Sequence, residues 1–167
     1  DRIFDILDLK PIIKNENNAK AIGKINGVVE FKDVTFSYDE NTEVLKKINF
    51  KVNKGEKIAL VGATGAGKTT IVSLLSRFYD PTDGEVLVDG KDIKKVDLES
   101  LRSQMGIMLQ DTFLFSSSIM ENIRYGRLDA TDEEVIKAAK AVNAHDFIMK
   151  LENGYDTDVN ERGSRLS

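Results

Sequence analysis

A loop at residues 62–70 constrains the fold of this chain more than any other feature. It reads Gly62-Ala63-Thr64-Gly65-Ala66-Gly67-Lys68-Thr69-Thr70 and fits the pattern G-x-x-x-x-G-K-[ST], which wraps the phosphates of a nucleotide. The apolar run 58–61 precedes the loop, and residues 69–78 follow it with apolar side chains at helical spacing. The sequence therefore predicts a strand, a glycine loop and a helix, in that order.

The residue types in this loop suit a triphosphate, which carries several negative charges and many acceptor oxygens. Gly62, Gly65 and Gly67 let the backbone curl so that its amides point inward. The N-terminus of the following helix adds unpaired amides and about half a positive charge. In this motif Lys68 reaches the β- and γ-phosphates, and the hydroxyl of Thr69 ligates Mg²⁺. We therefore predict that the amides of residues 64–70 bind the triphosphate of Mg·ATP.

Composition excludes several other kinds of site. The 167 residues suffice for one modest domain, and a net charge of −4 with dispersed cations argues against a nucleic-acid partner. The chain has no cysteine and only one histidine, His145, so thiol chemistry, Cys/His zinc sites and Ser-His-Asp catalysis are excluded. His145 is interpreted as an ordinary helix residue. No apolar run reaches the 18 residues of a bilayer-spanning helix, and we expect a soluble, intracellular segment.

Alternating and turn-bounded runs predict the remaining elements of the first part of the chain. Antiparallel strands are expected at residues 28–31, 34–38 and 44–52, and a further strand between two turns at 85–88. Lysines in and after the third run alternate with apolar residues, which indicates the wet face of a strand rather than a nucleic-acid patch. Asp97 can cap a short helix that runs to Gln104, and a buried strand is expected at 106–109. Residues 1–9 are typical of the end of a helix, and the polar residues 14–27 of a linker.

The last third of the chain is predicted to be helical. A helix over 118–125 has Gly126 as its stop. The capping box Thr131-Asp132-Glu133-Glu134 opens a second helix that runs to about Val142. A third helix is expected over 144–151.

Several short motifs, taken in their order along the chain, resemble those of one family. Thr35-Phe36-Ser37-Tyr38 precedes the phosphate loop, Leu109-Gln110-Asp111 follows it, and the chain ends on Leu166-Ser167. With these motifs nearly the whole chain is similar to the nucleotide-binding domain of ATP-binding cassette (ABC) transporters. The likeness is to the exporter type, that of multidrug or lipid half-transporters.

Two segments carry the likeness to exporters in particular. Residues 111–126 contain Asp111-Thr112-Phe113-Leu114-Phe115 and Glu121-Asn122-Ile123-Arg124-Tyr125-Gly126, with Ser118 where the family usually has threonine. Residues 157–163 resemble the exporter X-loop, with Asn160 where glycine is more usual. Residues 1–9 also resemble the segment that joins the last transmembrane helix to this domain.

The resemblance implies roles for individual residues outside the phosphate loop. It puts Tyr38 on the adenine with Val44 beside it, and Gln110 on Mg²⁺ and the attacking water. It makes Glu161 and Arg162 candidates for contact with the coupling helices of the transmembrane domain. Leu166 and Ser167 would be the first two residues of the signature LSGGQ.

The architecture implied by the resemblance is α/β: a P-loop NTPase core with an N-terminal antiparallel β subdomain and a helical subdomain. Residues 1–27 would be the end of a connecting helix and a linker, 28–110 the core, and 111–167 the Q-loop, helical subdomain, X-loop and start of the signature. The cofactors would be ATP and Mg²⁺. The partners would be a second nucleotide-binding domain, identical or different, and a transmembrane domain, at the cytoplasmic face of the cell membrane. No nucleic acid is expected.

The C-terminal part of the core is expected to be absent from these 167 residues. Family order puts the catalytic glutamate and the switch histidine after Ser167. Val86-Leu87-Val88-Asp89 imitates the apolar strand that ends in an aspartate, but Gly90 follows, so an ordinary strand and turn is predicted. We expect the full-length protein to be an ATPase coupled to transport, whereas this fragment alone binds ATP at best. Because the sheet of run 58–61 needs further strands, the fragment alone should aggregate or stay partly unfolded.

Three alternatives remain open at this stage. One is a soluble ABC-type ATPase of DNA repair or chromosome maintenance, which shares parts of this chemistry. Another is a degenerate module that holds ATP without turnover. The third, an importer ATPase, is disfavoured by residues 111–126 and by the predicted N-terminal helix.

Overall fold

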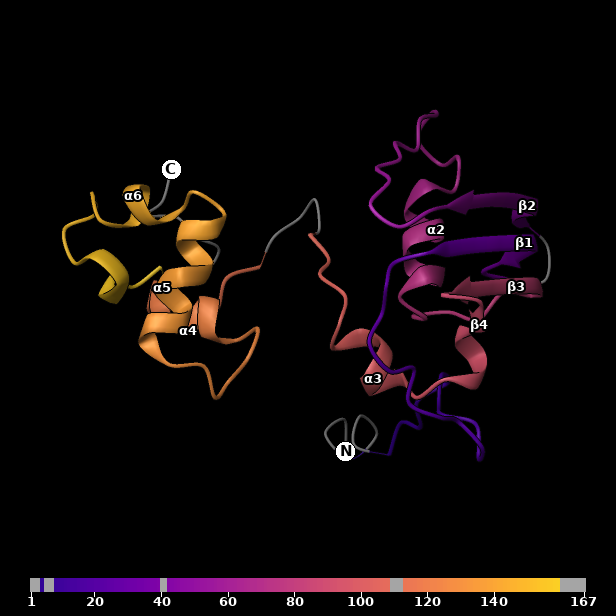
Figure 1. Cartoon of the computed structure of the whole chain (residues 1–167), viewed down its shortest axis with the longest axis horizontal. Coiled ribbons are helices and arrows are strands. Elements are labelled where there is room, and N and C mark those ends of the chain that lie inside the picture. Colours follow the sequence, from indigo (N-terminus) through magenta and orange to yellow (C-terminus); the bar gives the residue numbers. More distant parts are fainter. Residues whose placement is uncertain (1–3, 5–7, 40–41, 109–112, 160–167) are drawn as a thin grey trace. The chain divides into compact units, whose positions relative to one another are not determined.

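The computed structural model describes residue 4 and residues 8–39, 42–108 and 113–159. They form two compact units, one within residues 1–106 and the other within 107–167. Figure 1 shows strands and helices in the first unit and helices in the second. Of the predicted helix at 1–9, only Phe4, Asp8 and Leu9 are described. The amide of Asp8 donates to the carbonyl of Phe4 at 2.8 Å, as in one helical turn.

The first unit is built on a four-stranded antiparallel sheet with the strand order β2-β1-β3-β4 (Figure 1). Its strands are β1 Val29–Ser37, β2 Glu43–Val52, β3 Asp83–Val88 and β4 Lys91–Asp92. Val29 lies opposite Val52 on one side and Val88 on the other. The predicted strands at 28–31 and 34–38 are therefore a single strand. Asp33, with a φ of 47°, stands where its register shifts.

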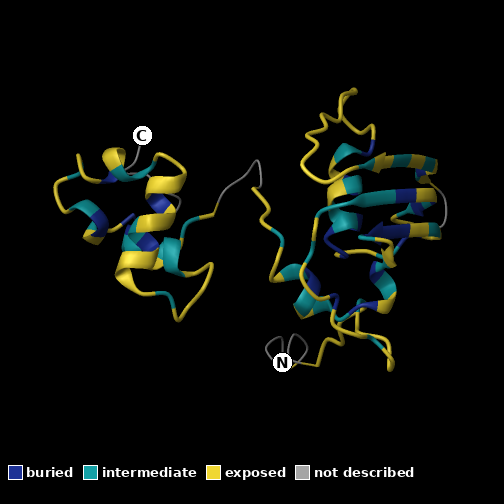
Figure 2. Ribbon diagram, in the orientation of Figure 1, coloured by how far each residue is buried: buried dark blue, intermediate teal, exposed yellow. Residues whose placement is uncertain are grey.

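Helix α2 (Lys68–Leu75) follows the phosphate loop and packs on this sheet. Its Leu74 is buried with Phe31 and Val34 of β1. Figure 2 shows exposed bands alternating with more buried ones along β1 and β2, as expected where one face of a sheet is in water. The lysines of β2 are exposed, which confirms the predicted wet face. Helix α2 is shorter than predicted because Arg77 takes a left-handed φ of 52° soon after its end.

Two short helical segments follow the sheet. A 3₁₀ turn, η1 (Ile93–Lys95), leads into helix α3 (Leu98–Arg102). The carboxylate of Asp97 accepts a hydrogen bond from the amide of Ser100, which confirms the predicted N-cap. This bond also lowers the pKa of Asp97 from its ordinary value.

The predicted linker has no regular secondary structure, but it is fixed to the unit by many hydrogen bonds. We call residues 14–28 the anchored segment. The backbone of Lys20 exchanges bonds with Lys95 and Asp97. Further along, the carboxylate of Asp89 accepts from the amides of residues 26, 27 and 28 at 2.5, 3.1 and 3.0 Å. The bonds from Asn26 and Val28 contribute most to lowering the pKa of Asp89.

Arg77 joins the anchored segment to the end of α2. Its side chain is 2% exposed. Its guanidinium donates to a carboxylate oxygen of Asp80 at 2.9 Å, to the carbonyl of Val96 at 3.3 Å and to the carbonyl of Lys14 at 3.1 Å. A buried guanidinium is tolerated only with such partners. The buried guanidinium therefore connects the turn after α2 to the anchored segment and to Val96.

Two predicted strands, at 58–61 and 106–109, are not strands in the described structure. Ile58 is 53% exposed and Val61 90%, and Met108 is 94% exposed, while residue 109 lies outside the described residues. A buried strand takes its hydrogen bonds and its cover from neighbouring strands. Within the described ranges no strand pairs with either run. The apolar pattern was identified correctly, but pattern alone does not form a strand.

The second unit consists of short helices around a small core (Figure 1). Its elements are α4 Ile119–Arg124, α5 Asp132–Ala141, α6 His145–Ile148 and the 3₁₀ turn η2 Gly154–Asp156. Ser118 caps α4, and Thr131 forms the predicted capping box with Glu134. The core gathers Ile119, Ala139, Ile148, Tyr155 and Val159.

His145 lies in the first turn of α6, in agreement with the prediction of an ordinary helix residue. Its Nδ1 lies 3.0 Å from the hydroxyl oxygen of Tyr155. Burial raises the pKa of Tyr155. This pair ties α6 to η2.

No helix within the described ranges combines the length and the apolar content that a bilayer crossing requires.

Candidate nucleotide-binding site

The phosphate loop is curled in the way that its glycines predicted. Gly65 and Gly67 have φ values of 83° and 84°, a region that L-residues with side chains rarely adopt. The amide of Ala66 donates to the carbonyl of Ala63 at 3.1 Å and closes a tight turn. Gly67 is the N-cap of α2, and its carbonyl accepts the first helical bond, from Ile71, at 3.0 Å. The loop therefore leads directly into a helix N-terminus, where an anion is stabilised.

The last glycine of the loop lies against β2. A Cβ atom on Gly67 would meet Cδ2 of Leu45 at 2.6 Å and Cγ1 of Val44 at 3.5 Å. Leu45 belongs to the buried core of the first unit. The close approach thus fixes the loop on the sheet. It also puts Val44, predicted to lie beside the adenine, next to the start of α2.

The side chain of Lys68 folds back over the loop. Its Nζ donates to the carbonyl oxygens of Gly62 at 2.8 Å and of Ala63 at 2.7 Å. An ammonium has three donors and carries a full charge, so this one is presented at the loop that would hold phosphate oxygens. The role of Lys68 toward the phosphates stays a prediction.

Magnesium would depend on few protein ligands in this unit. Thr69 is exposed in the first turn of α2, and its hydroxyl is a hard oxygen donor of the kind Mg²⁺ accepts. No group of three or more acidic, histidine or cysteine side chains gathers among the described residues. A site made of one hydroxyl and the phosphate oxygens suits Mg²⁺, which keeps several waters and binds with substrate phosphates. Gln110, the other predicted ligand, lies outside the described residues.

Tyr38 stands at the end of β1, over the start of α2. Its ring is 53% exposed. Its hydroxyl lies 3.0 Å from the hydroxyl of Thr70, which is buried in the first turn of α2. The rings of Phe36 and Tyr79 meet it at 4.8 and 5.1 Å between centroids, each at 88°. An exposed, well-supported ring next to a phosphate loop can stack on a nucleobase.

Sequence reasoning missed Tyr79. It follows α2 and has no motif of its own, so no spacing pointed to it. Only the folded chain brings its ring to Tyr38.

Residues 86–89, which are similar to the apolar strand that ends in an aspartate, form an ordinary strand and turn, as predicted. Residues 86–88 are buried in β3, and Asp89 has a φ of 50° in the turn that follows. The Asp89 carboxylate is engaged by three backbone amides of the anchored segment. Asp89 therefore has a structural role in the sheet.

The predicted residues of the second unit lie mostly outside the described residues. These are Glu161, Arg162, Leu166 and Ser167, together with Asn160. Of segment 111–126, Phe113, Phe115 and Tyr125 form an exposed aromatic cluster. Phe115 lies 5.1 Å from Phe113 and 4.5 Å from Tyr125 between ring centroids.

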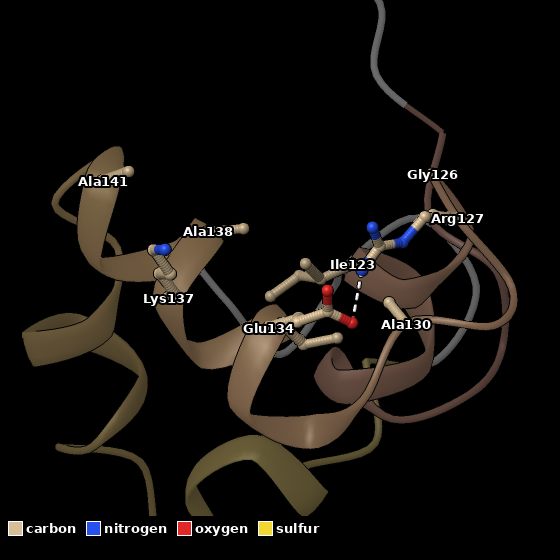
Figure 3. Close-up of a pocket in the computed structure, with 9 residues that line it drawn as sticks. Ile123, Gly126, Arg127, Ala130, Glu134, Lys137, Ala138 and Ala141 are labelled. Atoms are coloured by element: carbon tan, nitrogen blue, oxygen red, sulfur yellow. Dashed lines mark ion pairs between the residues drawn. The ribbon is translucent and has the colours of Figure 1, made fainter. Parts of the chain in front are cut away.

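The second unit also has a pocket of about 530 Å³ between the end of α4 and α5. Figure 3 shows Arg127 and Glu134 as an ion pair at this pocket, with alanines of α5 and Ile123 around them. The hydrogen bond from Arg127 is the first cause of the lowered pKa of Glu134. None of the predicted site residues lines this pocket.

Comparison with known proteins bears on the family of this chain. A family model described as ABC transporter matches residues 45–167. The ABC transporter ATP-binding protein YfiC of Bacillus subtilis is 53% identical over 167 residues, which are 100% of this chain and 28% of the relative. The putative multidrug export ATP-binding/permease protein YgaD of Bacillus subtilis is 51% identical over 168 residues, 100% of this chain and 29% of the relative.

The chain is also similar to a relative from another organism and to a solved structure. The ATP-dependent lipid A-core flippase of Syntrophus aciditrophicus is 46% identical, over 99% of this chain and 28% of its own length. A bacterial Atm1-family ABC exporter solved with ATP bound is 44% identical, with a TM-score of 0.92 over 99% of this chain and 29% of the exporter chain. These names favour the exporter prediction over a DNA-repair ATPase. The chain belongs to the ABC transporter family, and within it resembles the nucleotide-binding domains of exporters.

Proposed function

We propose that this chain is the ATP-binding part of an exporter, in which binding and hydrolysis of ATP are coupled to transport across a membrane. The observation that carries the proposal is the phosphate loop with Lys68 folded over it and Tyr38 bonded to Thr70. One short stretch of structure thus offers a cation, curled backbone amides and an aromatic ring. The names of the relatives, a putative multidrug export permease and a lipid A-core flippase among them, support the direction of transport.

In this proposal the loop holds the triphosphate and Tyr38 carries the adenine. Lys68 exchanges its bonds to the carbonyls of Gly62 and Ala63 for bonds to phosphate oxygens. Thr69 holds Mg²⁺, which when bound neutralises part of the phosphate charge, and Gln110 senses the metal and the water. Val44 lines the base beside Tyr38. Residues 64–70 supply the amides.

Turnover needs groups outside this stretch of sequence. The chain spans about 28% of the length of the relatives it matches. We propose that a catalytic glutamate and a second nucleotide-binding domain complete the site. The second domain would face the phosphate loop with its signature, of which Leu166 and Ser167 are the first residues here.

We further propose that the second unit contacts a transmembrane domain at the cytoplasmic face of the membrane. The exposed cluster of Phe113, Phe115 and Tyr125 supports this, because exposed aromatic patches are typical of protein contacts. Glu161 and Arg162 would belong to the same contact. The domain bounds 1–27, 28–110 and 111–167 remain part of this proposal.

Nucleotide binding to the whole protein tests the proposal. A charge pair at 4 Å is worth about 4 kcal/mol at an effective dielectric of 20, whereas stacking one base is worth roughly 1–3 kcal/mol. We therefore expect Lys68→Ala to weaken Mg·ATP binding more than Tyr38→Ala does. Titration with a labelled ATP measures both. Equal affinity of Lys68→Ala and the parent protein would contradict the proposal.

A further inference from the structure

We propose that Tyr79 is a positioning residue for the nucleobase: its ring holds Tyr38 in the orientation that stacks on a purine. This inference rests on the proposed function, since it concerns the same site. It assigns a task to a residue that is neither in the phosphate loop nor next to it in sequence.

Tyr38 is fixed on three sides by groups of different kinds. Phe36 of the same strand meets its ring at 88°, and Tyr79 meets it at 88° from the turn after α2. Tyr79 also contacts Phe36, with 5.5 Å between centroids. Perpendicular pairs at these separations are the arrangement that aromatic quadrupoles favour. The hydroxyl of Thr70 holds the far end of Tyr38 at 3.0 Å.

The turn that carries Tyr79 is hydrogen-bonded on both sides of that residue. Before it, the guanidinium of Arg77 is buried and bonded to Asp80, directly after Tyr79. Beyond it, the amide of Thr82 donates to the carbonyl of Thr35, and the hydroxyl of Thr82 accepts from the amide of Ser37. The turn is thus bonded to the strand that ends at Tyr38. A ring presented from such a turn restricts its neighbour at little further cost in entropy.

Tyr79 and its neighbour Phe78 face different elements. The guanidinium carbon of Arg102, in α3, lies 5.1 Å from the centre of the Phe78 ring. Tyr79 contacts Phe36 and Tyr38. Phe78 therefore provides a matched control: an adjacent, half-exposed aromatic ring on the same turn, with contacts away from the site.

Without Tyr79 the ring of Tyr38 would have to be ordered when the nucleotide binds. Immobilising one side chain on binding typically lowers affinity about two- to tenfold. The effect should appear only for ligands that have a base. Inorganic tripolyphosphate has the phosphates without the base, so it reports on the loop alone.

The test compares Mg·ATP with Mg·tripolyphosphate on the whole protein by calorimetric titration. We expect Tyr79→Ala to raise the Kd for ATP about two- to tenfold and to change that for tripolyphosphate less than twofold. Tyr79→Phe should match the parent, because the ring and not its hydroxyl acts on Tyr38. Phe78→Ala should leave the ratio of the two constants unchanged.

If the Tyr79→Ala protein is folded, two outcomes overturn the inference: unchanged ATP binding, or weaker binding of ATP and of tripolyphosphate by the same factor. If Tyr79→Ala loses both ligands through misfolding, Tyr79→Leu decides, since it keeps most of the volume. Tyr79→Leu must then weaken ATP alone. A parent protein that binds no ATP would instead refute the proposed function.

Discussion

Replacing Gly67 by alanine tests whether the phosphate loop keeps its shape through its contact with β2. Gly67 has a φ of 84°, where an L-residue costs about 1–2 kcal/mol. The new Cβ would lie 2.6 Å from Cδ2 of Leu45 and 3.4 Å from the carbonyl oxygen of Val44. Leu45 is 2% exposed and cannot swing into solvent, and overpacking of this kind costs about 1–3 kcal/mol. We therefore expect Gly67→Ala to lower the free energy of local opening by about 2–5 kcal/mol, the sum of the two effects.

Gly65→Ala is the matched control for this variant. Gly65 has nearly the same φ, 83°, but an added Cβ would meet no atom within 4 Å. Gly65→Ala should therefore lower the free energy of local opening only by the backbone cost of a positive φ, about 1–2 kcal/mol. The difference between the two variants isolates the contact between the loop and β2.

Hydrogen–deuterium exchange of the intact protein can measure this difference. Peptides that cover β2 and α2 report the free energy of local opening, without a requirement that the whole protein unfold in one step. Exchange in both peptides should rise much more in Gly67→Ala than in Gly65→Ala. Equal effects in the two variants would refute the reasoning, because they would leave the loop held by its own turn alone.

Three further variants or conditions give separate tests. Tyr38→Phe keeps the ring but removes its bond to Thr70, so the ring has to be ordered when ATP binds; at about 0.5–1.5 kcal/mol for one immobilised side chain, the Kd for ATP should rise roughly two- to tenfold in the same titration. Thr131→Ala removes the capping box with Glu134 and should destabilise α5 by about 1 kcal/mol, seen as faster exchange in a peptide over residues 132–141. Acidification should release the anchored segment, because the lowered pKa of Asp89 means that its bonds stabilise the fold above the ordinary pKa of about 4. That stabilisation is lost as the pH falls through the lowered value. Exchange over residues 26–28 at graded pH, corrected for the intrinsic rate, should show this loss in the parent and not in Asp89→Asn.

Features encoded within a few residues could be predicted from the sequence. The caps at Asp97, Ser118 and Thr131 each need one side chain and a nearby amide. Asp97 and Thr131 were predicted as caps, and Ser118 is the first residue of a predicted helix. The phosphate loop likewise needs only its own glycines and the helix that follows. Such local motifs carry their structural meaning within the pattern itself.

Features that depend on distant contacts could not be predicted. The runs at 58–61 and 106–109 have the composition of buried strands, but strand formation depends on partners. Tyr79 is conspicuous only when β1 and the turn after α2 come together. Arg77 belongs to no sequence motif, but in the structure it is buried and bonded to three different segments.

The anchored segment determines how the first unit responds to a displacement of the chain ahead of residue 14. Its bonds to Arg77, Ser100, Gln104 and Asp89 are spread along its whole length. A tensile load applied there would act on bonds at several points of the unit and not on a single one. Its points of attachment are the turn after α2, helix α3 and the turn after β3.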